Sequence, residues 1–285
     1  MRNRTYGVAV TMVAALAIGG CNQTATTGSA AAPAAPQAQP SFVEYGEFYA
    51  RPEQLGPVPV NEIVKSMRLN ATAKMEGEEV YKKNCASCHG ADLKGLADQH
   101  TPDLTDANWR FTGDDLESAG QTKFPSDVEW TVRYGIRSGH ENARGLEADM
   151  VAFDPQYRNE TDTKEFGNRR FLTPDEIADV AEYVLQISSQ EADAAKAARG
   201  KTLFLEGTKG NCYDCHENEG TGDPSLGSTN LTQKNLYLYG SDRASILESI
   251  NRGRHGVMPA FEGRLKPEEI KAVSVYVYAF ARPAK

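Results

Sequence analysis

Two short stretches of the chain, Cys85-Ala86-Ser87-Cys88-His89 and Cys212-Tyr213-Asp214-Cys215-His216, share the spacing C-x-x-C-H. This spacing places two thiols that can form thioethers with a porphyrin beside an imidazole that can bind its iron. A thioredoxin-like dithiol, or a zinc site assembled from both CxxC pairs, would explain the cysteines but not the two histidines. We therefore expect two covalently bound heme c groups, with thioethers to Cys85, Cys88, Cys212 and Cys215 and iron ligands from His89 and His216.

The sequence around these stretches is duplicated. Each C-x-x-C-H follows a helical pattern that contains a glycine, Gly77 in one copy and Gly200 in the other. Glycine inside a helix costs about 1 kcal/mol relative to alanine, so we expect another backbone to approach closely at both positions. The separation of His89 from Thr105 also equals that of His216 from Thr232, which indicates a repeated unit. The predicted organisation is a leader at 1–20, a flexible tether and irregular segment at 21–70, and two all-α domains at 71–190 and 191–285.

Each repeat ends in a well-marked helix. The first begins at Thr173-Pro174-Asp175-Glu176, a capping box with proline at the first helical position, and the second at Lys266-Pro267-Glu268-Glu269. We expect each last helix to pack on the glycine-bearing first helix of its own repeat. Apolar residues fall on one face of each helix: Ile177, Val180, Ala181, Val184 and Leu185 in the first, and Ile270, Val273, Val277 and Tyr278 in the second.

A second axial ligand decides what each iron can do. In the second repeat, Met258-Pro259 in a glycine-rich loop before the last helix predicts Met258 as the ligand of heme 2. In the first repeat Met150 is the expected ligand of heme 1, although Val151 stands where a proline would be expected. His140 is the rival ligand, and its alternative role is a hydrogen-bonded loop histidine. Thioether ligands favour Fe(II), and two protein ligands leave no position for oxygen or peroxide, so we expect electron transfer rather than catalysis. The sequence contains no nucleophile–base triad, phosphate-binding loop or paired-carboxylate motif.

The N-terminus predicts export and a lipid anchor. A positive flank precedes a short apolar run, Val8–Gly20, which is typical of a secretory signal and short for a bilayer span. The run ends in Ile18-Gly19-Gly20-Cys21, which resembles a bacterial lipobox and implies cleavage before Cys21 and lipidation of its thiol. An uncleaved N-terminal anchor, or a cut nearby that leaves Cys21 unmodified, are the alternatives. The prediction is a protein held on the periplasmic face of a bacterial membrane.

The formal net charge is −8, and loss of the leader would remove two further positive charges. This charge makes nucleic acid an improbable partner. An acidic surface suits docking to a basic patch on a redox protein, although it equally serves solubility.

Several sequence segments that flank the two C-x-x-C-H stretches resemble segments of subunit III of cbb3-type cytochrome c oxidases. Residues 135–140 and 150–153, with Trp109, resemble its first heme domain, and residues 224–232, 238–240 and 251–260 resemble its second. The resemblance implies two tandem class I cytochrome c domains that pass electrons from other c-type cytochromes to the catalytic subunits of a terminal oxidase. It also implies that Cys85, Cys88, His89 and Met150 serve one heme, and Cys212, Cys215, His216 and Met258 the other.

Three features depart from that family's pattern: a lipobox in place of a transmembrane helix, Val151 in place of proline, and an insertion at 154–171. The expected function is a membrane-anchored diheme cytochrome that serves a cbb3-type oxidase as subunit or close donor, and that is not catalytic alone. The alternatives are the electron-acceptor subunit of a periplasmic dehydrogenase and a diheme peroxidase, which would need an iron that opens to peroxide.

Overall fold

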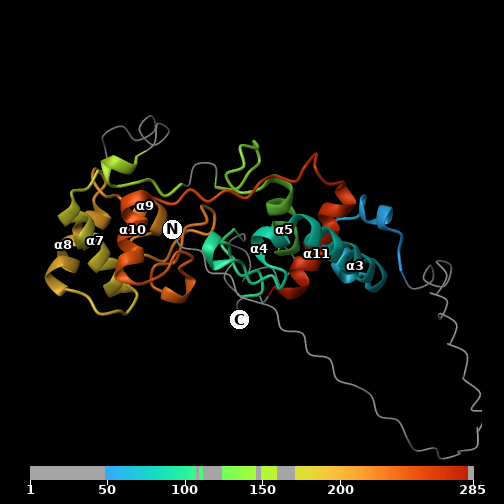
Figure 1. Cartoon of the computed structure of the whole chain (residues 1–285), viewed down its shortest axis with the longest axis horizontal. Coiled ribbons are helices and arrows are strands. Elements are labelled where there is room, and N and C mark those ends of the chain that lie inside the picture. The colour runs from blue at the N-terminus through green and yellow to red at the C-terminus, as the bar shows by residue number, and fades with distance from the viewer. Residues whose placement is uncertain (1–48, 107–108, 112–123, 146–148, 159–170, 282–285) are drawn as a thin grey trace, which may run out of the picture. The chain divides into compact units, whose positions relative to one another are not determined.

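The computed structural model describes residues 49–106, 109–111, 124–145, 149–158 and 171–281 (Figure 1). The leader, Cys21 and most of the tether lie outside these ranges, as do residues 159–170 of the insertion. The described residues form helices joined by loops, with isolated β-bridges and no strand, which confirms the all-α prediction. The α-helices are α2 (Val60–Lys65), α3 (Met67–Asn84), α4 (Ala86–His89), α5 (Phe124–Tyr134), α7 (Pro174–Ile187), α8 (Ala194–Leu205), α9 (Tyr213–His216), α10 (Arg243–Arg252) and α11 (Pro267–Phe280).

The last helices do not pack on the first helices of their own repeats. Helix α11, from the second repeat, packs on α3 and α5 of the first, and α7, from the first repeat, packs on α8 and α10 of the second (Figure 1). The predicted partners were therefore wrong. We call the packing unit of α3, α4, α5 and α11 cluster A, and that of α7, α8, α9 and α10 cluster B.

The two glycines identify this exchange most clearly. A Cβ at Gly77 would lie 2.2 Å from the carbonyl oxygen of Ala272 in α11, and a Cβ at Gly200 would lie 1.9 Å from that of Asp179 in α7. The predicted close approach of a second backbone is confirmed at both positions. Aromatic pairs complete the crossings: Tyr81 meets Tyr276 with ring centroids 5.6 Å apart, and Tyr183 meets Phe204 at 5.2 Å.

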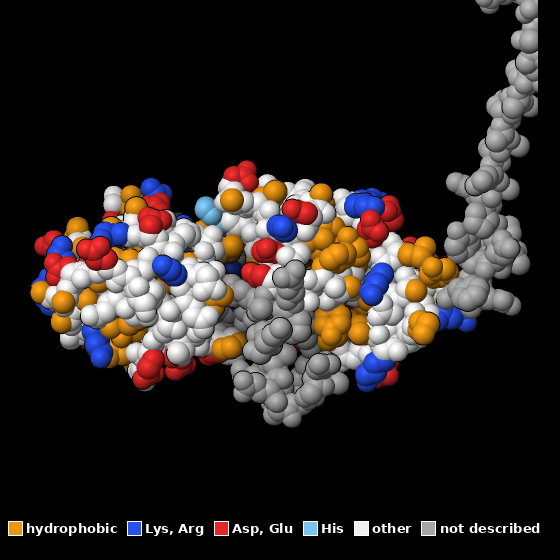
Figure 2. Space-filling view, turned by 90° about the horizontal axis from the view of Figure 1, so that it is seen from below, with side chains coloured by type: hydrophobic (Ala, Val, Ile, Leu, Met, Phe, Trp, Pro, Cys, Tyr) orange, Lys and Arg blue, Asp and Glu red, His pale blue; other side chains and the backbone are white. Residues whose placement is uncertain are grey.

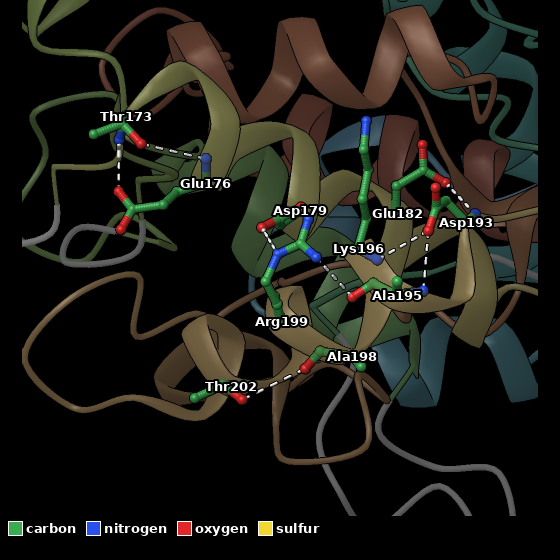
Figure 3. Close-up of polar contacts among 10 residues, drawn as sticks. All are labelled: Thr173, Glu176, Asp179, Glu182, Asp193, Ala195, Lys196, Ala198, Arg199 and Thr202. Carbon is green, nitrogen blue, oxygen red and sulfur yellow. Dashed lines mark hydrogen bonds and ion pairs between the residues drawn. The ribbon is translucent and has the colours of Figure 1, made fainter.

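Charge and chain length both favour the observed partners. Six residues, 188–193, separate α7 from α8, and helices joined by a short connection usually pack as neighbours. Asp179 of α7, which is buried, accepts hydrogen bonds from Nε and Nη2 of Arg199 in α8 at 2.7 and 2.6 Å (Figure 3). Glu76 precedes Gly77 as Arg199 precedes Gly200, so α7 on α3 would set Asp179 against a carboxylate.

A second buried carboxylate fixes α7 within cluster B. Glu182 accepts from Nε and Nη2 of Arg243 in α10, both at 3.0 Å, and from the backbone amide of Asp193 at the start of α8 at 2.8 Å. Figure 3 shows Glu182 beside Asp193, which caps α8. The predicted capping box of α7 is also present, because Thr173 Oγ1 accepts from the amide of Glu176 and the Glu176 carboxylate accepts from the amide of Thr173 (Figure 3).

Part of the segment expected to be irregular is helical. A 3-10 helix at Pro52–Leu55 and helix α2 precede α3, which itself begins at Met67, before the expected start of the first repeat. Leu55, Val60 and Ile63 are buried against Ala272 and Val275 of α11. These apolar side chains explain the helical structure, because they pack with Ala73 of α3 against α11 and are buried there.

Candidate heme site

One cavity of about 650 Å³ contains the predicted chemistry. His89 and His216, with Cys88, Cys212 and Cys215, line it. Met150 and Met258 line the same cavity, so the structure brings the predicted ligands of both repeats together. Its wall is mainly apolar and aromatic and includes Trp109, Phe111, Val128, Val180, Phe204, Leu231, Ile246 and Ile250.

Each C-x-x-C-H forms a short helix that presents its histidine to this cavity. Helices α4 and α9 each end at the histidine, after α3 and α8 respectively. Nδ1 of His216 lies 2.9 Å from the carbonyl oxygen of Thr229, a contact that fits Nδ1–H donation and leaves Nε2 free for a ligand bond. Pro102 follows His89 by the same number of residues, and its backbone carbonyl opposes the lowering of the His89 pKa, although Nδ1 of His89 forms no hydrogen bond with the described residues.

Burial keeps both imidazoles neutral. Desolvation lowers the pKa of His89 and of His216, in each case against the smaller opposing effect of the backbone carbonyl. A neutral imidazole is the form that binds iron. The lowered pKa of both rings favours the neutral form that a proximal heme ligand needs.

The cysteines fit thioether formation better than metal binding. None of the four forms a disulfide in the described structure, and burial, together with the neighbouring Cys88, raises the pKa of Cys85 to about 11. A thiol that resists deprotonation is a poor zinc ligand. Within the described part of the chain, no group of three or more His, Cys, Asp or Glu side chains could hold a metal ion.

The methionines lie in the opposite packing units from those that sequence order predicts. Met258 packs in cluster A, on the core that Cys85, Leu104 and Trp109 also contact. Met150 packs in cluster B, on the core that Cys212 and Leu231 contact. Sequence order had paired Met150 with heme 1 and Met258 with heme 2. Each methionine packs instead near the C-x-x-C-H stretch of the other repeat, because the chain that carries it leads into an exchanged last helix.

Backbone hydrogen bonds hold the crossed loops together. Ile136 and Met258 exchange two bonds, each with nitrogen and oxygen 3.0 Å apart, and the amide of Arg254 donates to the carbonyl of Met150 at 2.7 Å. A Cβ at Gly135 would lie 2.3 Å from the Met258 oxygen, and one at Gly253 would lie 2.1 Å from the Met150 oxygen. The two methionine loops therefore cross in the same way, each over a glycine of the other repeat.

The rival ligand, His140, has other partners. Its Nε2 lies 3.2 Å from Oε2 of Glu262, and its Nδ1 accepts from the amide of Asn142 at 3.0 Å. Both ring nitrogens are engaged, which supports the role of a hydrogen-bonded loop histidine.

Sequence reasoning missed the cationic part of the site. Arg110, Arg137 and Arg254 all line the cavity. Arg137 is paired with Asp149 at 3.1 Å, and the guanidinium of Arg254 lies over the ring of Tyr239 at 4.2 Å. No motif marks these arginines, because their proximity to the hemes depends on loops from both repeats.

The residues present fit heme c. The cavity offers apolar walls for a porphyrin, two neutral imidazoles, cysteines at thioether spacing and two methionines. These are the groups with which a protein attaches a heme and saturates its iron. The arginines would suit the acidic edge of the porphyrin.

Comparison with known proteins agrees with this geometry. The family model for cytochrome c matches residues 75–188, and the model described as "Cytochrome C oxidase, cbb3-type, subunit III" matches residues 195–277. The cbb3-type cytochrome c oxidase subunit FixP of Bradyrhizobium sp. (strain ORS 278) is 38% identical over 79% of this chain and 67% of the relative. The subunit CcoP of Cereibacter sphaeroides is 34% identical over the same shares. The chain therefore belongs to the family of cbb3-type cytochrome c oxidase subunit III, with two cytochrome c domains.

Proposed function

We propose that the chain is a diheme cytochrome that relays single electrons to the catalytic subunits of a cbb3-type oxidase. The observation that carries this proposal is that both C-x-x-C-H histidines and both methionines line one cavity. Two protein ligands per iron suit outer-sphere transfer, because they leave no coordination position for a substrate. When bound, each heme supplies a one-electron Fe(III)/Fe(II) couple.

The chain's own residues would hold each heme across the exchange. One heme would be attached to Cys85 and Cys88, and its iron would be bound by His89 and Met258. The other heme would be attached to Cys212 and Cys215, and its iron would be bound by His216 and Met150. Each site then needs both repeats, so neither repeat alone should bind its heme in a native way.

The anchor is part of the proposal. Among the described residues, no helix is long and apolar enough to cross a membrane. From the lipobox-like sequence Ile18-Gly19-Gly20-Cys21, we infer that lipidated Cys21 holds the protein at the periplasmic face. On the face shown in Figure 2, the acidic and basic side chains of the described residues are interspersed.

Purification tests this function. The full chain carrying an affinity tag is isolated from detergent-solubilised membranes of its own host. Co-purification of heme–copper oxidase subunits, with two low-spin c hemes in this chain that ascorbate reduces and the oxidase re-oxidises, is the expected result. Co-purification of a substrate dehydrogenase that reduces these hemes instead would establish the alternative partner. A Cys21→Ala variant should keep both hemes but no longer incorporate labelled fatty acid.

A further inference from the structure

Arg110 belongs to the first repeat, yet its side chain binds the second. Its Nη2 donates to the carbonyl oxygen of Leu236 at 3.0 Å. The preceding residue, Trp109, packs in cluster A. The following residue, Phe111, lies on Gly227, where a Cβ would come within 2.2 Å of the ring. These contacts fix residues 109–111 across both packing units and direct the guanidinium towards the second heme site.

Arg110 forms no ion pair with the described residues, and the carboxylate of Asp106 acts on its charge only from a longer distance. Its one hydrogen bond goes to a neutral carbonyl, and no carboxylate of the described residues lies within 4 Å of it. Two neighbouring arginines differ: Arg137 pairs with Asp149 at 3.1 Å, and Arg144 with Asp127 at 2.8 Å. Burial lowers the pKa of Arg110, so its charge is poorly solvated. A buried guanidinium is stabilised by a hydrogen-bonded anion, and it presents paired N–H donors that match a carboxylate.

The bound heme would supply that anion. A heme carries two propionate carboxylates on the edge away from its thioethers. Arg110 lines the cavity. Its hydrogen-bond partner Leu236 falls in the sequence between Leu231 and Tyr237, and both of these residues pack on the core of cluster B. We propose that Arg110 binds a propionate of the heme attached to Cys212 and Cys215, so that the first repeat supplies an electrostatic determinant of the second heme's potential. This inference rests on the proposed diheme function.

A fixed positive charge beside a heme favours Fe(II) over Fe(III) and so raises its midpoint potential. Loss of Arg110 should therefore lower the potential of the second heme and leave that of the first almost unchanged. A guanidinium that served only to hold Leu236 would have no such selective effect.

The test uses the full-length holoprotein with Arg110→Gln, Arg110→Lys and the control Lys201→Gln. The control removes one positive charge from an exposed position on α8 of cluster B. Each variant is titrated by optical spectroelectrochemistry, and resonance Raman spectra record the propionate bending bands. A further His216→Met change alters the proximal ligand of the heme attached to Cys212 and Cys215, raises its potential and so identifies that heme.

We expect Arg110→Gln to lower one midpoint potential clearly and to shift the propionate bands of the same heme, with partial recovery in Arg110→Lys. Lys201→Gln should change neither measurement. The proposal is overturned if Arg110→Gln alters both potentials as little as Lys201→Gln does, or shifts the potential without changing the propionate bands. A protein that lacks two c hemes by heme staining and mass would instead contradict the proposed function itself.

Discussion

Replacement of Gly200 by alanine tests the close backbone contact between α7 and α8. The new Cβ would lie 1.9 Å from the oxygen and 2.4 Å from the carbon of the Asp179 carbonyl, and 2.8 Å from the amide nitrogen of Val180. All three atoms belong to the backbone of α7, so no side-chain rotation can relieve the contact. The helices must separate by about 1.5 Å before the Cβ reaches ordinary contact distance.

The cost follows from that separation. Overpacking of a rigid core costs about 1–3 kcal/mol or more, and a backbone-to-backbone clash falls at the upper end. Alanine returns about 1 kcal/mol through its higher helix propensity. We therefore expect a net loss of about 2 kcal/mol, which lowers the Tm of a protein of this size by roughly 4–8 °C.

Thermal unfolding of the holoprotein, followed by far-UV circular dichroism, measures this effect. Gly207→Ala is the matched control, because its Cβ would meet only the Tyr213 hydroxyl at 3.6 Å. The strain in Gly200→Ala should also change the absorption spectrum of the heme attached to Cys212. Gly77→Ala should instead change the spectrum of the heme attached to Cys85. A Gly200→Ala protein as stable as Gly207→Ala would refute the reasoning.

Three further predictions concern α7. Reversal of the Asp179–Arg199 pair, as Asp179→Arg with Arg199→Asp, should recover part of the stability that each single change removes; additive losses in a double-mutant cycle of urea unfolding would contradict the pairing. Thr173→Ala removes the cap of α7 and should cost about 1 kcal/mol by the same denaturation, whereas an unchanged midpoint would show that the cap is dispensable. Burial alone would raise the pKa of Glu176, but hydrogen bonds from Lys209 and Thr173 outweigh it and lower the pKa below 4.5. Its contribution is therefore present above pH 4.5 and lost as the pH falls through the lowered pKa, so Glu176→Gln should flatten the acid limb of a stability–pH profile.

Local signals in the sequence predicted local structure well. The capping box at Thr173 and the apolar face of α7 appear where the pattern places them, because caps and helical periodicity depend on neighbours in the chain. Gly77 and Gly200 also predicted close backbone contacts correctly. A glycine inside a helix lowers the stability of the helix, so its presence there indicates a contact that a larger side chain would prevent.

The partners of those helices could not be read from the repeat. Both last helices present similar apolar faces and both first helices carry the same glycine, so hydrophobic pattern alone fits either pairing. The Asp179–Arg199 pair and the six-residue link before α8 favour the exchange. Both signals were present in the sequence, but they favour one arrangement only when the two possible pairings of first and last helices are compared with each other. The same ambiguity explains why the packing unit of each methionine could not be read from sequence order.

A crystal structure of the heme-loaded protein tests the central claim most directly. The account predicts that Sδ of Met258 bonds the iron of the heme attached to Cys85 and Cys88, and that Sδ of Met150 bonds the iron of the heme attached to Cys212 and Cys215. A structure in which each methionine binds the heme of its own repeat would contradict the exchanged architecture.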